Sequence, residues 1–394
     1  MSEWKKVKLG EICERVTSGG TPKANVSSYY NPPTIPWLKT KEVNYCRITE
    51  TENYISEEGL KNSSAKLISP NSVIIAMYGQ GDTAGRIAIN KIPLATNQAC
   101  CNLTIDKSKA DYEFIYYQLC TLYDKLVSLK AGAAQPNLNA RIIKNLEIIM
   151  PSLPIQHRIA SILSRYDSLI ENYQKQIKLL GEAAQRLYKE WFVDLRFPGH
   201  ENTKIVDGVP EGWEKKRLID LVDVQYGYAF DGKLFNSSGE GMPILRIRNI
   251  PDGITSDYTT EEAQDCYIVH NGDIVVGMDG IFHINSWSGG DAYLVQRACS
   301  FRPKEECMKG FIFQAIQEPI KFFEKTLVGA TVAHLGKKHI DSIELCIPKN
   351  FELYKPFSKF YNQRQGLLSQ IRLLTEARDR LLPKLMSGEI NVES

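Results

Sequence analysis

The sequence predicts an α+β protein built from two mostly β modules in tandem repeat, each followed by one long helix. Three observations predict this fold class: the two halves of the chain resemble each other, their apolar runs are short and β-branched, and each half ends in a heptad pattern. The expected segments are the first module at 1–152, its long helix at 153–195, a linker at 196–212, the second module at 213–349 and its long helix at 350–390.

The internal repeat is clearest near the ends of the two halves. Residues 176–187 match residues 370–381 at eight of twelve positions, and one further position exchanges Lys for Arg. Shorter matches occur earlier and in the same order, such as residues 72–77 with residues 273–278. A period close to half the chain length indicates two copies of one structural unit.

Each copy is expected to be mostly β. Apolar runs such as Val73–Ile75 and Ile274–Val276 are short, β-branched and bounded by Gly, Pro, Asn or Asp, which is typical of strands joined by turns. A few helices are expected among the strands, one of them at Tyr112–Leu129.

Two long stretches nearly free of Gly and Pro follow the modules, and apolar residues recur in both at alternating spacings of three and four. One such stripe usually marks a surface helix that packs on its own module. Because two stripes of equal length occupy corresponding places in the repeat, we expect the helices to pack on each other. The expected seam consists of Leu163, Tyr166, Ile170, Tyr173, Ile177, Leu180, Leu187, Phe357, Phe360, Leu367, Ile371, Leu374 and Leu381.

Two arginines, Arg364 and Arg378, interrupt the second stripe. Their long side chains are expected either to snorkel at the edge of the seam or to pair with acids of the first helix, such as Glu171 and Glu182.

The composition argues against several classes of protein. The chain has 48 Lys and Arg against 46 Asp and Glu, so its net charge of +2 is low for a protein that binds DNA tightly on its own through phosphate contacts. Nine cysteines without a C-x-x-C motif favour neither a disulfide framework nor a zinc ribbon, and no apolar run approaches the roughly 20 residues of a membrane span. We therefore expect a cytoplasmic protein with no membrane partner.

No motif for catalysis or metal binding is recognisable. The sequence Asn31-Pro32-Pro33-Thr34 is similar to the Asn-Pro-Pro-aromatic signature of adenine methyltransferases, but Thr34 replaces the aromatic residue and no glycine-rich cofactor loop precedes it. The glycines of 18–22 and 79–85 lack the spacing of phosphate-binding loops, and the six histidines form no H-E-x-x-H. We expect turns at these places, with no catalytic residue and no metal site.

The order and spacing of several short motifs resemble those of the specificity subunits of Type I restriction-modification enzymes. The resemblance covers essentially the whole chain. The motifs are Ser18-Gly19-Gly20-Thr21-Pro22, Ile35-Pro36-Trp37-Leu38, Asn97-Gln98, Gly132-Ala133-Ala134-Gln135-Pro136-Asn137-Leu138, Pro151-Ser152-Leu153-Pro154-Ile155-Gln156, Pro210-Glu211-Gly212-Trp213-Glu214 and the ending at 381–390.

The resemblance implies a non-catalytic, DNA-reading subunit of a bacterial or archaeal Type I restriction-modification complex. Its modules would be target-recognition domains, separated by the two helices packed as an antiparallel coiled coil with a pseudo-twofold. Each domain would read one half of a bipartite, asymmetric target in double-stranded DNA, while the helices set the gap and dock two methyltransferase subunits, which restriction or translocase subunits can join. S-adenosylmethionine, ATP and Mg would be bound by those partners and no cofactor by this chain.

Base reading needs side chains that reach the groove, chiefly Arg or Lys for guanine and Asn or Gln for adenine. Any single such residue is more often a solvated surface residue, but each module is expected to contain at least two true contacts. The candidates in the first module are Lys39, Lys41, Tyr78, Gln80, Arg86, Gln135 and Asn137, and those in the second are Arg246, Arg248, Asn249, His283, His334, Lys337 and Lys338.

Two other functions remain open at this point. A coiled-coil scaffold that contacts only proteins predicts no sequence-dependent protection of DNA in the assembled complex. A self-sufficient adenine methyltransferase would need a cofactor-binding α/β domain, for which the chain offers neither room nor motif.

Overall fold

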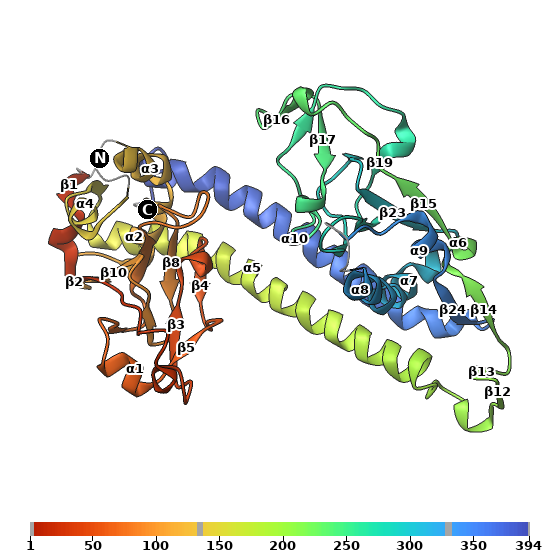
Figure 1. Ribbon diagram of the computed structural model, residues 1–394. Helices are drawn as coiled ribbons and strands as arrows, with labels where there is room; N and C mark the ends of the chain where they lie inside the picture. Colours follow the sequence, from red (N-terminus) through yellow and green to blue (C-terminus); the bar gives the residue numbers. More distant parts are fainter. Residues whose placement is uncertain (1–3, 132–136, 328–332, 393–394) are drawn as a thin grey trace. The chain divides into compact units, whose positions relative to one another are not determined.

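The computed structural model describes residues 4–131, 137–327 and 333–392. The chain divides into two compact units, and each unit contains one module together with segments of both long helices (Figure 1). The first unit consists of Met1–Ser168 and Leu374–Ser394, and the second of Leu169–Leu373.

The first module contains three small sheets, with strand orders β1-β11, β2-β10-β7-β8-β4 and β5-β3-β9-β6. Its strands are β1 (Lys5–Lys8), β2 (Cys13–Ser18), β3 (Ile35–Leu38), β4 (Cys46–Ile48), β5 (Tyr54–Ile55), β6 (Leu67–Ile68), β7 (Val73–Ala76), β8 (Ile87–Asn90), β9 (Leu94–Thr96), β10 (Cys100–Ile105) and β11 (Glu147–Met150). Its helices are α1 (Glu57–Lys61), α2 (Tyr112–Cys120), α3 (Tyr123–Ala131) and α4 (Ala140–Lys144).

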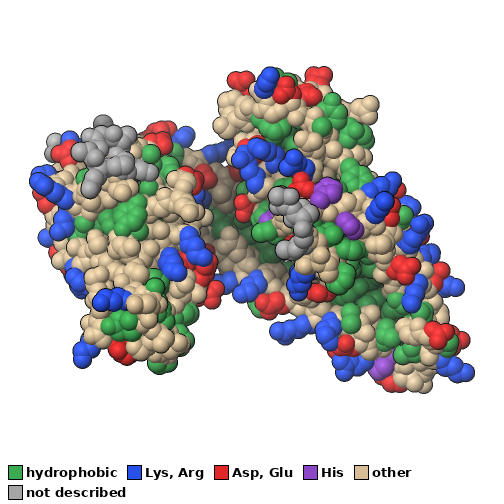
Figure 2. Space-filling view, viewed as in Figure 1, with side chains coloured by type: hydrophobic (Ala, Val, Ile, Leu, Met, Phe, Trp, Pro, Cys, Tyr) green, Lys and Arg blue, Asp and Glu red, His purple; other side chains and the backbone are tan. Residues whose placement is uncertain are grey.

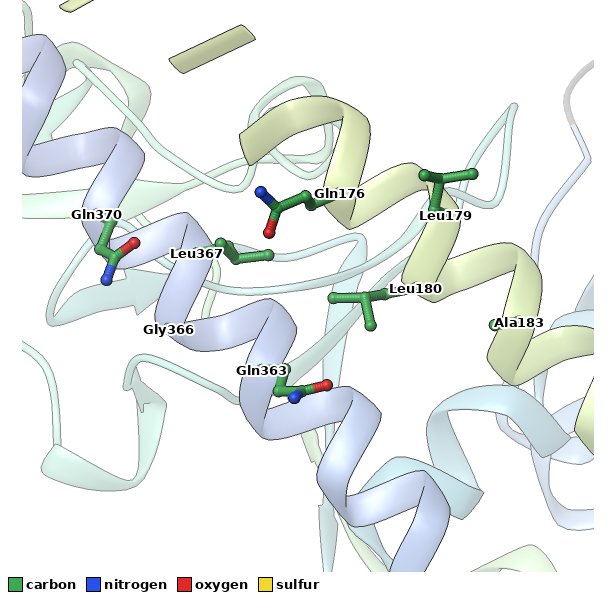
Figure 3. A pocket seen from close by; sticks show the side chains of 8 residues that line it. All are labelled: Gln176, Leu179, Leu180, Ala183, Gln363, Gly366, Leu367 and Gln370. Atoms are coloured by element: carbon green, nitrogen blue, oxygen red, sulfur yellow. The ribbon is translucent and has the colours of Figure 1, made fainter. Parts of the chain in front are cut away.

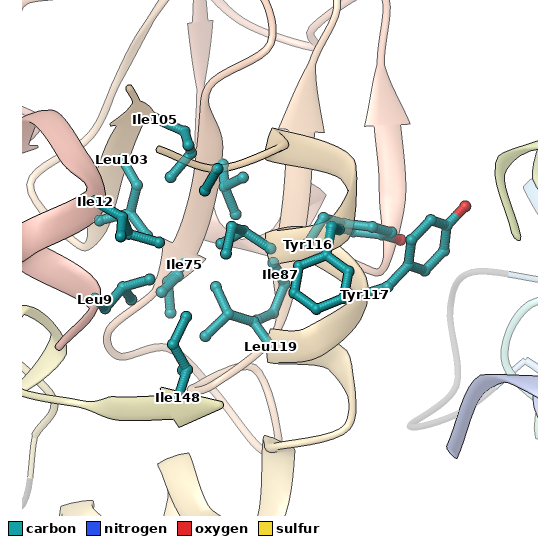
Figure 4. Packing of buried hydrophobic residues seen from close by; sticks show 14 of the residues in the cluster. Leu9, Ile12, Ile75, Ile87, Leu103, Ile105, Tyr116, Tyr117, Leu119 and Ile148 are labelled. Atoms are coloured by element: carbon teal, nitrogen blue, oxygen red, sulfur yellow. The ribbon is translucent and has the colours of Figure 1, made fainter. Parts of the chain in front are cut away.

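The five-stranded sheet of this module is covered on both faces, which explains its continuous apolar strands. Along β7, Val73 and Ile75 join the core beneath α2, whereas Ile74 and Ala76 join a second core on the opposite face. Successive side chains of a strand point to opposite faces, so a strand buried on both sides reads as an unbroken apolar run. Figure 4 shows side chains of the sheet and of α2 meeting in the first of these cores.

The second module repeats this architecture, with sheets β14-β24, β15-β23-β20-β21 and β16-β18-β17-β22-β19. Its strands are β14 (Trp213–Arg217), β15 (Val222–Tyr226), β16 (Phe235–Asn236), β17 (Met242–Leu245), β18 (Tyr258–Thr259), β19 (Ile268–Val269), β20 (Ile274–Gly277), β21 (Ile284–Ser286), β22 (Ala292–Leu294), β23 (Ala298–Pro303) and β24 (Glu344–Pro348). Its helices are α6 (Leu218–Leu221), α7 (Lys309–Ala315), α8 (Gln317–Thr326) and α9 (Lys337–Asp341), and β12 (Ile205–Val206) and β13 (Val209–Pro210) precede it.

The strand pairings confirm the internal repeat. The opening strand of each module pairs antiparallel with the strand that precedes the long helix, β1 with β11 and β14 with β24. Each module also contains one parallel pair in its last sheet, β3 with β9 and β17 with β22. The predicted α+β fold with two mostly β modules in tandem is therefore confirmed.

Two long helices follow the modules: α5 (Leu153–Tyr188), extended by a π-helical turn at Lys189–Val193, and α10 (Lys355–Met386). In the first unit, Arg158 of α5 donates to the carbonyl oxygen of Val392, just beyond α10, at 2.8 Å. In the second, the rings of Trp191 and Phe357 lie 6.0 Å apart. Because later residues of α5 meet earlier residues of α10, the helix segments within each unit are antiparallel.

One helix differs from the prediction. The segment Tyr112–Leu129 was expected to be a single helix, but the chain forms α2 and α3 with a break between them. The hydroxyl of Thr121 donates to the carbonyl oxygen of Gln118 at 2.8 Å, and the backbone closes as a turn there. Hydroxyl side chains compete in this way with helix continuation. In the part of the chain that the structure describes, no helix is long and apolar enough to cross a membrane.

Candidate nucleic-acid interface

The parallel pair β3–β9 of the first module and the parallel pair β17–β22 of the second each create an edge at which candidate DNA-binding residues meet. Leu38 at the end of β3 pairs with Thr96 at the end of β9, and Leu245 likewise pairs with Leu294. Parallel strands end on the same side of a sheet, so the turns that follow them are neighbours. We call these two places the first and second recognition edge: residues 39–42 with 97–98, and residues 246–249 with 296–297.

The second recognition edge lines an open hollow of about 480 Å³. The Arg246 guanidinium lies over the ring of Phe235, 5.3 Å from its centroid, in a cation–π contact. The hollow is lined by Phe230, Gly232, Phe235, Arg246, Ile247, Arg248, Val295, Gln296 and Arg297. The three arginines around this hollow could donate hydrogen bonds to guanine or to phosphate. The glutamine amide could pair with the donor and acceptor that adenine presents in the major groove.

Two of these arginines are held by carboxylates. Arg248 makes two hydrogen bonds to Asp257, at 3.1 and 2.5 Å. Arg297 lies 3.3 Å from Asp279, which also binds Nδ1 of His334 at 2.5 Å. The candidate His334 is thereby connected to the second recognition edge through Asp279.

The first recognition edge has the same layout with different side chains. Lys39 lies over the ring of Trp37, 5.1 Å from its centroid, and its Nζ donates to Oδ1 of Asn53 at 3.0 Å. Lys41 forms an ion pair with Glu52, and this hydrogen bond raises the pKa of the exposed Lys41 ammonium. Gln98 accepts a hydrogen bond from the hydroxyl of Thr21.

A pattern repeats between the two edges. The first cation of each turn, Lys39 or Arg246, lies against an aromatic ring, and within the described residues neither forms an ion pair with a carboxylate. The second cation, Lys41 or Arg248, is paired with an acid on the segment that follows. Lys39 and Arg246 are therefore more available to a ligand than their neighbours.

The remaining candidates of the first module lie on other turns. Tyr78 and Gln80 follow β7, and Arg86 precedes β8, where it binds Asp82 at 2.6 Å and Asn44 at 3.0 Å. The Arg86 guanidinium lowers the pKa of the Asp82 carboxyl through that hydrogen bond. Asn137 is exposed, and Gln135 lies outside the described residues.

The remaining candidates of the second module have mixed surroundings. Asn249 has a structural role, because its Oδ1 accepts from the backbone N–H of Arg246 at 2.9 Å and so closes the 3₁₀ turn Ile247–Asn249. His283 is half-buried beside β21, whereas Lys337 and Lys338 are exposed at the start of α9. Figure 2 shows Lys, Arg and His side chains together on the visible face of this unit.

Reasoning from sequence missed Arg297, which the structure places at the second recognition edge. Arg297 adopts a left-handed backbone conformation with a φ of 72°, in the tight turn between β22 and β23. Its position in the repeat corresponds to Gln98 of the first module, and this pairing was the available signal.

The glycine motif at 18–22 has a packing role. A Cβ on Gly19 would collide with the backbone of Thr96, and one on Gly227 would collide with the backbone of Val295. Gly19 thus lets the end of β2 approach β9, and Gly227 lets the end of β15 approach the end of β22; each of these approached strands leads into a recognition edge. Within the described residues no group of His, Cys, Asp and Glu is suited to a metal ion.

The residues expected in the helix seam are shielded from solvent in both units. All thirteen expected seam residues are buried or half-buried, whereas the neighbouring Leu169, Leu179 and Leu373 are exposed. In the second unit the seam opens into a hollow of about 510 Å³, where Leu180 and Leu367 extend between the helices and Gly366 supplies no side chain (Figure 3).

The arginines that interrupt the stripe have partners other than the acids named from the sequence. Arg378 binds Asp167 of α5 at 2.7 Å rather than Glu171 or Glu182, because the antiparallel register places residue 378 opposite residue 167. Asp167 also binds Arg47 of β4 at 2.9 Å and accepts from the Tyr117 hydroxyl at 2.5 Å. Arg364 lines a small cavity beside Leu180 and Ala184 of α5, and its Nη2 donates to Asn285 of the second module; within the described residues it pairs with no acid.

The fold and the two recognition edges define a class of protein. Its members have two repeated modules, each module carries cations at one edge, and both modules pack on the same two long helices. The chain belongs to the family described as Type I restriction modification DNA specificity domain, whose model matches residues 1–180 and 210–372.

Proteins similar to this chain are named as specificity subunits of Type I restriction enzymes. The Type I restriction enzyme MjaIX specificity subunit of Methanocaldococcus jannaschii is 28% identical over 99% of this chain and 94% of its own length. The EcoR124I/EcoR124II specificity subunit of Escherichia coli is 28% identical over 50% of this chain and 48% of its own length. The crystal structure of the S subunit from M. genitalium has the same fold, with a TM-score of 0.58, 18% identity, and coverage of 98% of this chain and 96% of that one.

Proposed function

We propose that this chain is the DNA-sequence recognition subunit of a Type I restriction-modification complex, in which each module reads one half of a bipartite, asymmetric target. The observation that carries the proposal is the recognition edge, which occurs at the same place in both modules with different side chains. Because the edge lies at the same place in both modules, we assign it the same role in each. Because its side chains differ between the modules, we expect the two edges to read different bases.

Within each edge we assign the leading role to the cation that lies on an aromatic ring. Arg246 can donate two parallel hydrogen bonds to guanine, whereas Lys39 presents a single compact charge to a base or a phosphate. Lys41 and Arg248 would have to break their ion pairs with Glu52 and Asp257 to contact DNA. We therefore expect them to shape the turn and add positive potential.

Replacing Arg246 by alanine should weaken binding to the half-site of the second module by about 1–3 kcal/mol, or roughly 5- to 150-fold, because one bidentate base contact is lost. Titration of duplexes with the purified methyltransferase complex measures this effect. Arg217→Ala is the matched control, since Arg217 is exposed in the same module and, among the described residues, forms its ion pair with Asp220. Equal affinities for the Arg246 and Arg217 variants would remove Arg246 from the interface.

The helices are proposed to set the gap between the half-sites and to dock two methyltransferase subunits. Residues 176–187 and 370–381 repeat each other, and the corresponding leucines Leu179 and Leu373 are 63% and 56% exposed. Two such equivalent surfaces fit two copies of one partner.

Inserting seven residues into both helices at corresponding positions should lengthen the gap by about 10 Å, or roughly three base pairs, without changing the bases read. The heptad length preserves the seam, so folding should be retained. Mapping methylated adenines in cells that carry the longer chain measures the gap. A change in half-site identity with an unchanged gap would show that the helices do not act as the spacer.

The methylation and cleavage reactions are proposed to be catalysed by the partner subunits. S-adenosylmethionine, ATP and Mg would be bound by methyltransferase and restriction subunits, which would also supply many phosphate contacts, since this chain has a net charge of only +2. The chain would act in the cytoplasm, where bacterial or archaeal DNA lies.

The proposal is tested by co-expressing this chain with the methyltransferase subunit and mapping methylated adenines by single-molecule sequencing. A split motif with a fixed gap that disappears without this chain supports it. Methylation by this chain alone would make it an enzyme, and methylation that is independent of the chain would leave only a scaffold.

A further inference from the structure

Arg364 of α10 is a charged side chain that is largely buried inside the second unit. Its Nη2 donates to Oδ1 of Asn285 at 2.6 Å, and its Nη1 donates to the Ser286 hydroxyl. The guanidinium also lies over the ring of Phe313, 5.5 Å from its centroid. Burial lowers the pKa of Arg364, and within the described residues its hydrogen-bond acceptors are neutral. A buried cation needs such acceptors because its loss of hydration is costly.

Asn285 connects this arginine to the second recognition edge. Its Nδ2 donates to the backbone carbonyls of Ile250 at 2.7 Å and Pro251 at 2.9 Å. These two residues directly follow the turn that carries Arg246, Arg248 and Asn249. One amide thus receives the helix arginine on its oxygen and holds the base-reading turn with its nitrogen.

We propose that Arg364 is a positioning residue for sequence reading by the second module. Arg364 and the backbone N–H of Ser286 both donate to Oδ1 of Asn285, and together they fix which end of the amide faces the turn, so that the Nδ2 group points at the carbonyls of Ile250 and Pro251. The backbone at 246–251 is thereby held to α10, and Arg246 is held at the edge. Arg364 itself contacts no base. The proposal rests on the function proposed above.

The first module is held to the helices by a different device. Arg47 of β4 points from the module to the carboxylate of Asp167 on α5, so the buried arginine lies on the module side and its acceptor on the helix. In the second module the arginine lies on the helix and its acceptor on the module. Because the devices are distinct, a change at Arg364 should affect the second module alone.

The experiment uses the full chain co-expressed with the methyltransferase subunit, with the host chromosome as the DNA probe. Arg364→Met removes the donors and the charge but keeps an unbranched apolar side chain at this position. At the bases read by Arg246, we expect discrimination to fall about tenfold, as for a weakened base contact, with the other half-site and the gap unchanged. Lys359→Met, at an exposed position of the same helix, is the control and should read the wild-type motif.

Asn285→Asp separates positioning from simple stability. The variant keeps an acceptor for Arg364, and adds a charge that favours it, but it removes the donor to Ile250 and Pro251. We expect the same bases to be relaxed as in Arg364→Met, with Arg364→Lys intermediate because one donor is restored. If both half-sites were weakened equally, or if Asn285→Asp read the wild-type motif, Arg364 would be structural only and the proposal would fail.

A measurement without DNA distinguishes failure of this proposal from failure of the proposed function. In the free chain, Arg364→Lys and Asn285→Asp should accelerate hydrogen exchange of the Ile250 and Gly253 amides, which close the turn through Ile247 and Asn249. Unchanged exchange in both variants would overturn the positioning role even if the wild-type complex read a split motif. Accelerated exchange with no motif would instead reject the proposed function.

Discussion

Replacing Asp167 by alanine is expected to lower the free energy of unfolding of the first unit by about 3–5 kcal/mol. The Asp167 side chain is 7% exposed and accepts from Arg47, Arg378 and Tyr117, and the side chain of Arg47 is 6% exposed. Removing the carboxylate takes away the charge partner that lies 2.9 Å from the buried Arg47 guanidinium and leaves it the longer contact to Glu113, at 3.6 Å. Such a loss costs more than the ion pair itself contributes.

Hydrogen exchange of the core amides of the first unit measures this loss, because exchange is followed amide by amide and so reports the stability of each unit by itself. Asp379→Ala is the matched control: Asp379 also binds Arg378, at 2.8 Å, but it is 55% exposed and should matter by less than about 1 kcal/mol. Similar losses in the two variants would mean that burial of the network does not stabilise the unit.

Phe357→Ala is expected to destabilise the second unit by about 3–5 kcal/mol, since a large buried aromatic side chain is replaced by a cavity. Phe357 is 1% exposed, and its ring lies 5.6 Å from that of Phe192 and 6.3 Å from that of Tyr188. Its carbonyl oxygen also lies against Gly310 of α7, so the site has little room to collapse.

Phe351→Ala supplies the comparison for this variant, because Phe351 lies on the turn before α10 and is 53% exposed. Hydrogen exchange of the core amides of the second unit should be nearly unchanged in this control and should accelerate strongly in Phe357→Ala. An equal, small effect in both variants would contradict the packing that places α10 in the core of this unit.

Much of the fold could be predicted because it follows from local patterns. The match between 176–187 and 370–381 revealed the repeat, and the β-branched runs at Val73–Ile75 and Ile274–Val276 correspond to buried strands β7 and β20. The break between α2 and α3 was missed because it depends on a hydroxyl–backbone contact at Thr121, which propensity alone does not reveal.

The candidate interface was only partly predictable. The candidates Lys39, Lys41, Arg246 and Arg248 can be selected from the sequence because they follow apolar runs. The ion pairs of Lys41 and Arg248, in contrast, depend on which segments become neighbours in the folded module. Arg364 contacts Asn285, 79 positions away, and no periodicity encodes such a contact. Arg297 was missed for a related reason, since its turn reaches the edge only when β17 and β22 pair in parallel.

The central claim, that each module reads its own half of a split target, is tested most directly by comparing methylation maps of Lys39→Ala and Arg246→Ala in the co-expressed complex. We expect each variant to relax bases in a different half of the motif, with the gap and the other half unchanged. Relaxation of the same bases by both variants, or a wild-type motif in both, would contradict the claim.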